Sequence, residues 1–229
     1  MNSHNISSKE KIMEPSRLMM SDCKINRILC ILEQTYPEAH CELNFRNPFE
    51  LLVATILSAQ TTDQKVNKVT AVLFERCPTP QKMLEITPRK FEEIIHPIGL
   101  FRTKAKNILQ TCQLLIEKYH GDVPANLDDL VKMPGVGRKT AGVVLANAYG
   151  IPALPVDTHV LRVANRLGLS LEKDPSKVEK ELTALIPKEL WIDTHHRLIF
   201  HGRRLCHARK PECPACPLKD CCPAFTSAS

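Results

Sequence analysis

The chain has 229 residues, of which 43% are hydrophobic and 24% charged, as in ordinary globular proteins. This composition excludes a disordered or collagen-like chain, and no apolar run approaches the ~18 residues that a membrane span needs. The first sixteen residues lack the apolar segment of a secretory signal. A formal net charge of +6 is compatible with a polyanionic partner but does not require one.

The hydrophobic pattern is helical almost throughout, with no stretch that alternates like a strand. Residues 1–20 are polar, and we expect them to be disordered. Asn47 followed by Pro48 is typical of a helix start, and the apolar run over 49–57 predicts a central helix buried on all sides. Further helices are predicted, in chain order, over 105–119, 127–132, 139–149, 160–167 and 178–186. The expected fold class is all-α.

A glycine turn joins two of these helices at Pro134-Gly135-Val136-Gly137-Arg138-Lys139. Gly135 and Gly137 allow the main chain to approach a ligand closely, and the next helix begins directly behind them. Its free N–H groups and positive dipole end form an anion site that suits a DNA phosphate, with Arg138 and Lys139 beside it. The alternative is a tight turn between helices that binds nothing.

Two residues in this region suggest catalysis. Lys139 lies in the first turn of its helix beside Arg138, where the helix dipole and the neighbouring charge favour the neutral, nucleophilic amine. It could equally be a lysine that only contacts phosphate. Asp157 precedes the helix over 160–167 and is a natural N-cap, a role that would also fix its carboxylate for acid–base chemistry.

Cysteines concentrate at the end of the chain, where five of the ten follow residue 205. Four of them form the pattern Cys206-x6-Cys213-x2-Cys216-x5-Cys222. One compact loop with a single CxxC pair favours a [4Fe–4S] cluster over zinc, and the lack of a signal peptide argues against disulfides. Cys221 is an adjacent rival for the fourth ligand that spacing alone does not exclude.

Five segments in this order resemble the endonuclease III family, the bifunctional DNA glycosylase/AP lyases of the helix-hairpin-helix–Gly/Pro/Asp superfamily. They are Leu57-Ser58-Ala59-Gln60-Thr61-Thr62-Asp63, Ile98-Gly99-Leu100, 133–140, Val156-Asp157-Thr158-His159 and the cysteine loop. The resemblance covers nearly the whole chain from about residue 24 to 223.

The resemblance implies a two-lobed helical fold. A six-helix barrel domain would span 41–151 and carry the helix-hairpin-helix motif at about 127–149. Residues 21–40 and 152–229 would form the iron–sulfur cluster domain. Duplex DNA with damaged pyrimidines or abasic sites would bind across the cleft between the lobes.

The resemblance also assigns roles to individual residues. Lys139 would be the nucleophile that attacks C1′, with Asp157 assisting it, and β-elimination would then cleave the strand 3′ to the lesion. Gln60 would fill the gap left by the flipped base, and Leu100 would wedge the opposite strand. The family pattern chooses Cys222 over Cys221 as the fourth cluster ligand. The DNA contacts expected from the hairpin are Gly135, Val136, Gly137 and Arg138, and the other cluster ligands are Cys206, Cys213 and Cys216.

Three alternatives stay open. An adenine-mismatch glycosylase of the same superfamily would lack the hairpin lysine and carry a further C-terminal domain, so Lys139 and the end at Ser229 argue against it. A non-catalytic DNA-binding protein would use the hairpin only as a phosphate clamp. An electron-transfer protein would cycle its cluster without DNA. We also expect a monomer without membrane contact, cytoplasmic and nucleoid-associated if the source is bacterial.

Overall fold

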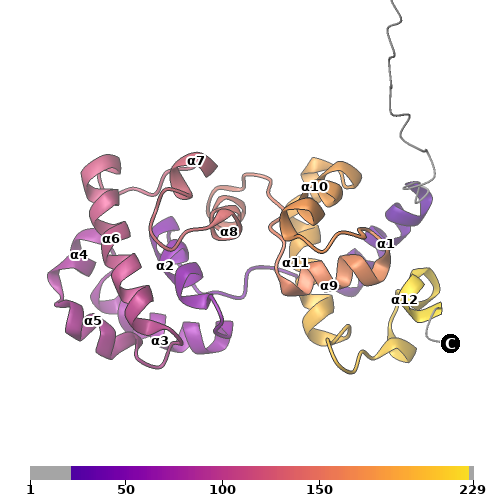
Figure 1. The fold of residues 1–229 in the computed structure, drawn as a ribbon, viewed down its shortest axis with the longest axis horizontal. Coiled ribbons are helices and arrows are strands. Elements are labelled where there is room, and N and C mark those ends of the chain that lie inside the picture. Colours follow the sequence, from indigo (N-terminus) through magenta and orange to yellow (C-terminus); the bar gives the residue numbers. More distant parts are fainter. Residues whose placement is uncertain (1–21, 227–229) are drawn as a thin grey trace, which may run out of the picture.

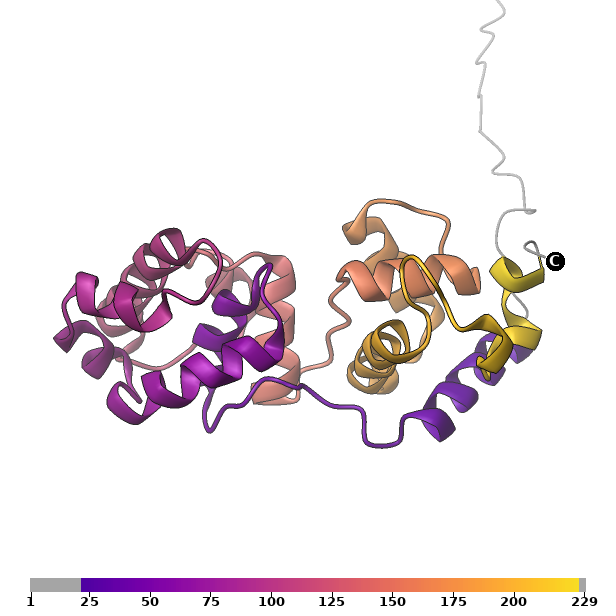
Figure 2. The ribbon, with the colours of Figure 1, turned by 90° about the horizontal axis from the view of Figure 1, so that it is seen from below.

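The structure, a computed structural model, describes residues 22–226 and consists of helices and turns, with no strand among those residues. The predicted disordered extension, residues 1–20, lies outside this range. Figure 1 shows two groups of helices side by side, which we call the left lobe and the right lobe. The chain passes between the lobes twice, at residues 36–47 and 150–157 (Figure 2). No helix in the described range combines the length and apolar character needed to cross a membrane.

The left lobe is formed by consecutive helices. They are α2 (Pro48–Ser58), α3 (Asp63–Arg76), α4 (Pro80–Glu85), α5 (Pro88–Ile95), α6 (Phe101–Tyr119), α7 (Leu127–Leu130) and α8 (Arg138–Tyr149).

The right lobe combines the N-terminal helix with the C-terminal part of the chain. Its α-helices are α1 (Asp22–Thr35), α9 (Thr158–Leu167), α10 (Pro175–Leu185), α11 (Trp191–Arg204) and α12 (Pro223–Thr226). Short 3-10 turns at Lys188–Leu190, Cys213–Ala215 and Lys219–Cys221 complete the lobe.

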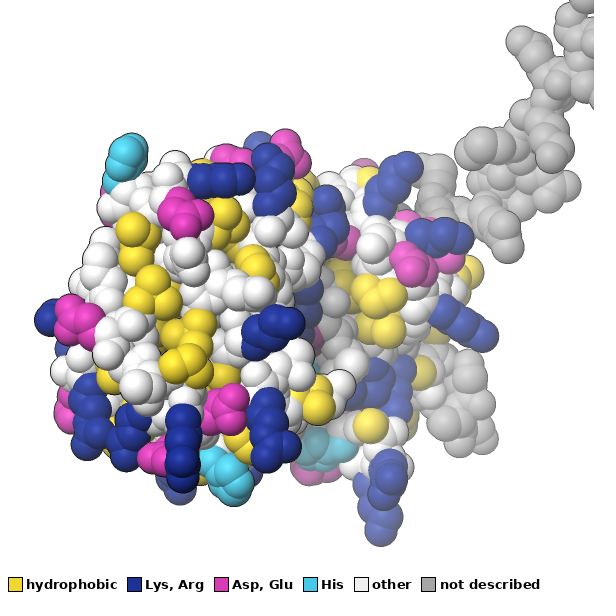
Figure 3. Space-filling view, turned by 60° about the vertical axis from the view of Figure 1, so that its left-hand side comes forward, with side chains coloured by type: hydrophobic (Ala, Val, Ile, Leu, Met, Phe, Trp, Pro, Cys, Tyr) yellow, Lys and Arg dark blue, Asp and Glu magenta, His cyan; other side chains and the backbone are white. Residues whose placement is uncertain are grey.

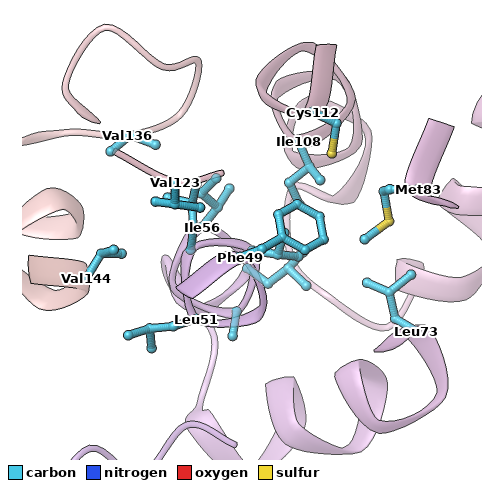
Figure 4. Packing of buried hydrophobic residues seen from close by; sticks show 14 of the residues in the cluster. Phe49, Leu51, Ile56, Leu73, Met83, Ile108, Cys112, Val123, Val136 and Val144 are labelled. Atoms are coloured by element: carbon cyan, nitrogen blue, oxygen red, sulfur yellow. The ribbon is translucent and has the colours of Figure 1, made fainter. Parts of the chain in front are cut away.

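Helix α2 lies at the centre of the left lobe, as its all-round apolar sequence predicts. Every residue from Phe49 to Leu57 is buried, and α3, α6 and α8 pack against the helix. Figure 4 shows Leu51 and Ile56 of α2 among side chains from α3, α6 and α8, including Leu73, Ile108 and Val144. The Asn47 side chain accepts a hydrogen bond from Glu50 N at 2.9 Å, which confirms the predicted N-cap.

The buried hydrophobic residues form two separate clusters. One contains only residues between 43 and 145, and the other combines residues 25–36 with residues between 154 and 221. We propose that these clusters are the cores of the two predicted domains, 41–151 and 21–40 plus 152–229.

Several helix boundaries differ from the predicted ones for local reasons. Helix α6 starts at Phe101 rather than at 105, because Phe101 is followed by three polar residues that interrupt the apolar pattern. Helix α7 ends at Leu130 rather than at 132, because Met133 N donates to Leu130 O at 3.1 Å and begins the hairpin turn. The predicted C-terminal glycines of α8 and α9, Gly150 and Gly168, both adopt the left-handed conformation.

We expect Asn47→Ala to lower the free energy of unfolding by about 1 kcal/mol, because Glu50 N loses its capping partner at the start of the central helix. Urea denaturation measures this change. Asn47→Asp keeps an acceptor at the cap and should lose much less stability. An Asp variant as unstable as the Ala variant would contradict the capping role.

Candidate functional site

The hairpin turn holds Gly135 in a conformation that other residues avoid, whereas Gly137 has an extended backbone and open space around it. Gly135 has a φ of +80°, and a Cβ there would lie 2.9 Å from Asn107 Nδ2, so both backbone and space favour glycine. Thr111 Oγ1 donates to Pro134 O at 3.1 Å and fixes the turn against α6. Val136 is buried, and its N–H donates to Met133 O at 3.0 Å. The exposed part of the turn is therefore Gly135, Gly137 and the start of α8.

Lys139 and Asp157 line the same small cavity between the lobes, which has a volume of about 80 Å³. Lys139 is exposed in the first turn of α8, and Asp157 is the half-buried N-cap of α9. The remaining walls include Asp63 at the start of α3 and Arg203 from α11. The structure thus brings the two candidate catalytic residues, which are distant in sequence, into one site.

The N-cap bonds fix the Asp157 carboxylate. Its Oδ1 accepts from His159 N and from Val160 N, each at 2.8 Å. Both bonds go to one oxygen, so Oδ2 stays outside the capping interaction. The capping role that sequence suggested therefore coexists with a second role at the cavity.

Polar bridges between the lobes enclose this cavity. Arg203 of α11 forms an ion pair with Asp63 at 2.8 Å and a second with Glu42 in the segment before α2. His196 Nε2 is 2.8 Å from Asn147 Oδ1 of α8. The cavity therefore depends on both lobes.

Gln60 and Leu100 lie in two neighbouring loops of the left lobe. Both adopt left-handed backbone conformations, with φ of 56° and 58°. A Cβ on Gly99, next to Leu100, would lie 3.9 Å from Gln60 O, so the loops are adjacent. Gln60 is exposed, and Leu100 is 62% exposed, an unusual placement for a large apolar side chain. The two residues are available for contact with a partner.

Basic side chains accompany this part of the surface. Figure 3 shows Lys and Arg side chains along the lower edge of the left lobe, with single acidic groups among them. This is the edge where α3 and α5 lie in Figure 1. Such an edge can attract a phosphate backbone.

Cys206, Cys213, Cys216 and Cys222 line one cavity of about 220 Å³ in the right lobe. Cys221 does not line it; this residue is buried against the second cluster and borders a separate hollow with Cys23 and Arg27. Four cysteines around one cavity suit a thiolate-bound cluster. In residues 22–226, no three His, Cys, Asp or Glu side chains are arranged to hold a single metal ion.

Donors surround two of these sulfurs. Arg166 Nη1 donates to Cys206 Sγ at 3.2 Å, and His201 Nε2 lies 3.6 Å from Cys216 Sγ. Tyr36 OH is 3.1 Å from His201 Nδ1. A positive charge and N–H donors stabilise thiolates, so the donor set fits an anionic cysteine-ligated group.

Comparisons with known proteins agree with this geometry. Residues 53–188 match the family model described as "HhH-GPD superfamily base excision DNA repair protein". Endonuclease III of Bacillus subtilis is 52% identical over 188 residues, which cover 82% of this chain and 86% of that protein. Endonuclease III of Escherichia coli K12 is 46% identical over 203 residues, 89% of this chain and 96% of that protein.

The chain belongs to the endonuclease III family.

Solved structures support this assignment. A non-covalent endonuclease III–DNA complex superposes with a TM-score of 0.88 at 49% identity, covering 92% of this chain and 99% of that one. A trapped endonuclease III–DNA covalent intermediate matches equally well. A thermostable thymine-DNA glycosylase, at 23% identity and a TM-score of 0.82, shares the fold. The all-α fold class and the predicted family are thereby confirmed. Members of this family are base-excision enzymes that act on DNA, and so is this chain.

Two buried histidines, His195 and His196, border the cavity. Burial and the neighbouring His196 lower the pKa of His195 to about 3. Burial, and then the charge of His40, lowers the pKa of His196 to about 4. Both rings are therefore uncharged at neutral pH.

The sequence analysis did not single out Arg203, which lines the cavity, or Lys104, which lies beside the Gln60 loop. Arg203 lies close to the cysteine loop in sequence, but it reaches back to Asp63 in the left lobe. Lys104 is 5% exposed and stands one turn before Ile108 on the buried face of α6. A lysine at an apolar position of an amphipathic helix was the available signal.

We expect stability to fall as the pH drops below about 6.5, the ordinary pKa of histidine. His195 and His196 stay neutral in the folded chain while the unfolded chain takes up protons, and this loss continues toward their folded pKa values of about 3 and about 4. Urea denaturation at about pH 7 and about pH 5 measures it. His196→Gln should reduce the difference between the free energies of unfolding measured at the two pH values.

His120→Asn is the matched control, because His120 is exposed and asparagine tolerates its left-handed backbone. This variant should lose as much stability between the higher and the lower pH as the native chain does. The same difference in the His196→Gln variant as in the native chain would contradict the assignment of this loss to the buried ring.

Proposed function

We propose that this chain removes oxidised pyrimidines from duplex DNA and cleaves the resulting abasic site by β-elimination. One observation carries the proposal: the hairpin lysine, Lys139, and the N-cap carboxylate, Asp157, line one cavity between the lobes. Relatives named endonuclease III, one of them trapped covalently on DNA, support it.

Lys139 is the nucleophile in this scheme. Its neutral amine attacks C1′ of the flipped nucleotide, the C1′–N bond breaks, and the base leaves with a proton. The sugar ring opens to an imine that links C1′ to Nζ. Loss of a C2′ proton then expels the 3′ phosphate, and water hydrolyses the imine to release the enzyme.

Asp157 assists by holding its carboxylate beside the reacting sugar. Hydrogen bonds from His159 N and Val160 N hold Oδ1, which leaves Oδ2 to accept a proton from the lysine or to stabilise the cationic sugar. Because the carboxylate is already fixed by the α9 N-terminus, little ordering is needed during the reaction.

DNA binding uses the exposed ends of the left lobe. The turn at Gly135, Gly137 and Arg138, with the first amides of α8, binds backbone phosphates, and Val136 shapes that turn. Gln60 fills the gap in the stack left by the flipped base, while Leu100 wedges the opposite strand. Flipping costs a few kcal/mol, least for a damaged base, which contributes to selectivity.

The cysteine cavity holds a [4Fe–4S] cluster in this proposal, with Cys206, Cys213, Cys216 and Cys222 as its ligands. The group contributes shape and charge to the end of the right lobe rather than a reaction step. Cys221, directed away from the cavity, is not a ligand. We further propose that the protein acts as a monomer on DNA in the cytoplasm.

Lys139→Gln should abolish the protein–DNA adduct that borohydride traps on a duplex with one thymine glycol or one abasic site, because no amine is left to form the imine. A denaturing gel measures the adduct. Lys132→Gln, an exposed lysine before the same turn, is the matched control and should form as much adduct as the native chain.

Asp157→Asn completes this test, since asparagine caps helices as well as aspartate does. Its melting temperature should stay close to the native value while the rate of base removal falls by about 10²- to 10⁴-fold. An absent adduct with native protein that still binds DNA would overturn the lyase assignment and favour a non-catalytic clamp.

Cys216→Ser should reduce bound iron and the broad absorbance near 400 nm after anaerobic purification, because one of the four ligands is lost. Cys221→Ser should keep both at the native level. Iron analysis and absorption spectra measure these quantities. Equal losses in the two variants would contradict the ligand set, and zinc in place of iron would contradict the cluster.

A further inference from the structure

Lys104 places a buried ammonium group beneath the loop that carries Gln60. The residue belongs to the first turn of α6 and is only 5% exposed. Its Nζ donates to Leu57 O at 2.9 Å and to Ala59 O at 2.6 Å, and Thr61 Oγ1 lies 3.3 Å away. The contacts lie on both sides of Gln60 in the chain.

These contacts complete the end of helix α2. The last carbonyls of a helix have no partner within it, and a cation there is favoured by the helix dipole. Lys104 supplies that cation from a different helix. The chain can therefore leave α2 sharply at Ala59 and enter the left-handed conformation of Gln60, whose φ is 56°.

The same residue is joined to the second loop. Lys104 N donates to Leu100 O at 3.1 Å, the bond that begins α6 directly after the left-handed Leu100. Gly99 lies against Gln60 O and Thr61 Oγ1, each 3.9 Å from its Cβ position. The backbone of Lys104 thus holds the Leu100 loop, and its side chain holds the Gln60 loop.

Stability alone is a poor reason for this arrangement. None of the ion pairs formed within residues 22–226 gives Lys104 an acidic partner. Burial lowers the pKa of its ammonium, which reflects the penalty of placing a cation away from water. The gain is a fixed geometry for two exposed side chains that no other contact between the loops supplies so directly.

We propose that Lys104 is a positioning residue that holds Gln60 and Leu100 at a fixed separation, so that both enter the duplex together at a lesion. This inference rests on the proposed function, because it takes those two residues as the groups that enter the DNA. Lys104 itself touches neither the substrate nor the reacting atoms.

Equilibrium binding of the full chain to two duplexes tests the proposal. One duplex carries a tetrahydrofuran abasic analogue, which the enzyme cannot cleave, and the other is undamaged. The variants are Lys104→Met, which removes all three side-chain contacts, and Lys104→Gln, which keeps N–H donors on a shorter side chain. Lys106→Met is the matched control, because it removes an exposed lysine from the same helix.

We expect Lys104→Met to bind the abasic duplex about tenfold or more weakly, since small misplacements of positioned groups carry penalties of this order. Binding to undamaged DNA should change less than about twofold, because a buried amine contacts no phosphate. The affinity of Lys104→Gln for the abasic duplex should lie between those of Lys104→Met and the native chain. Lys106→Met should change the affinity for both duplexes by the same factor.

A second readout reports entry into the duplex directly. The fluorescence of 2-aminopurine placed opposite the abasic analogue rises when this base is unstacked. Native protein should raise it at saturation, and Lys104→Met should raise it much less although the DNA is fully bound. Thermal unfolding shows whether each variant is folded. If Lys104→Met is not folded, Lys104→Gln replaces it in both measurements.

Two results with Lys104→Met would overturn the inference while leaving the proposed function intact: unchanged affinity for both duplexes, or an equal loss of affinity on both. Failure of the proposed function looks different. Native protein would then show neither preference for the abasic duplex nor a Lys139 adduct.

Discussion

Helix α2 has no face for solvent, and this constraint organises the left lobe. Its residues from Phe49 to Leu57 are buried, so α3, α6 and α8 must surround it. Both ends of the helix then reach the surface with unpaired backbone groups. Asn47 satisfies the first end, and Lys104 satisfies the second, next to Gln60. The helix that forms the core therefore also determines the position of Gln60, the residue that we propose enters the DNA.

The candidate active-site cavity follows from how the two lobes are joined. Each lobe has its own hydrophobic cluster, and polar contacts join the lobes beside the cavity. Arg203 bonds to Asp63, and His196 bonds to Asn147. Because Lys139 comes from one lobe and Asp157 from the other, these bridges set the geometry of the candidate catalytic pair.

Sequence was most informative where local chemistry decides structure. The cap at Asn47, the glycine ends of α8 and α9, and the apolar run of α2 all follow from local rules and are confirmed. Helix α11 was not predicted from the apolar pattern, because its buried face includes His195, His196 and His201. Their burial depends on partners such as Asn147 and Tyr36, which are distant in sequence.

In the candidate site, too, residues with a local sequence signal were predicted and residues that depend on distant partners were not. Lys139 and Asp157 were found because each stands at a helix start with recognisable sequence. Arg203 and Lys104 were missed because their roles depend on chain segments more than forty residues away, Asp63 for the first and Leu57 for the second. No periodicity or spacing rule contains that information.

The buried histidines clarify how charge is distributed in the cavity. His195 and His196, with pKa values of about 3 and about 4, are neutral at physiological pH and add no positive charge beside Lys139. In the proposed mechanism they therefore neither repel the cation that forms on the sugar nor compete with Lys139 for proton transfer. Arg203 carries a permanent charge, but Asp63 and Glu42 bind it. In the proposed mechanism, the acid–base steps are left to the amine of Lys139 and the carboxylate of Asp157, which is the division of roles that imine chemistry needs.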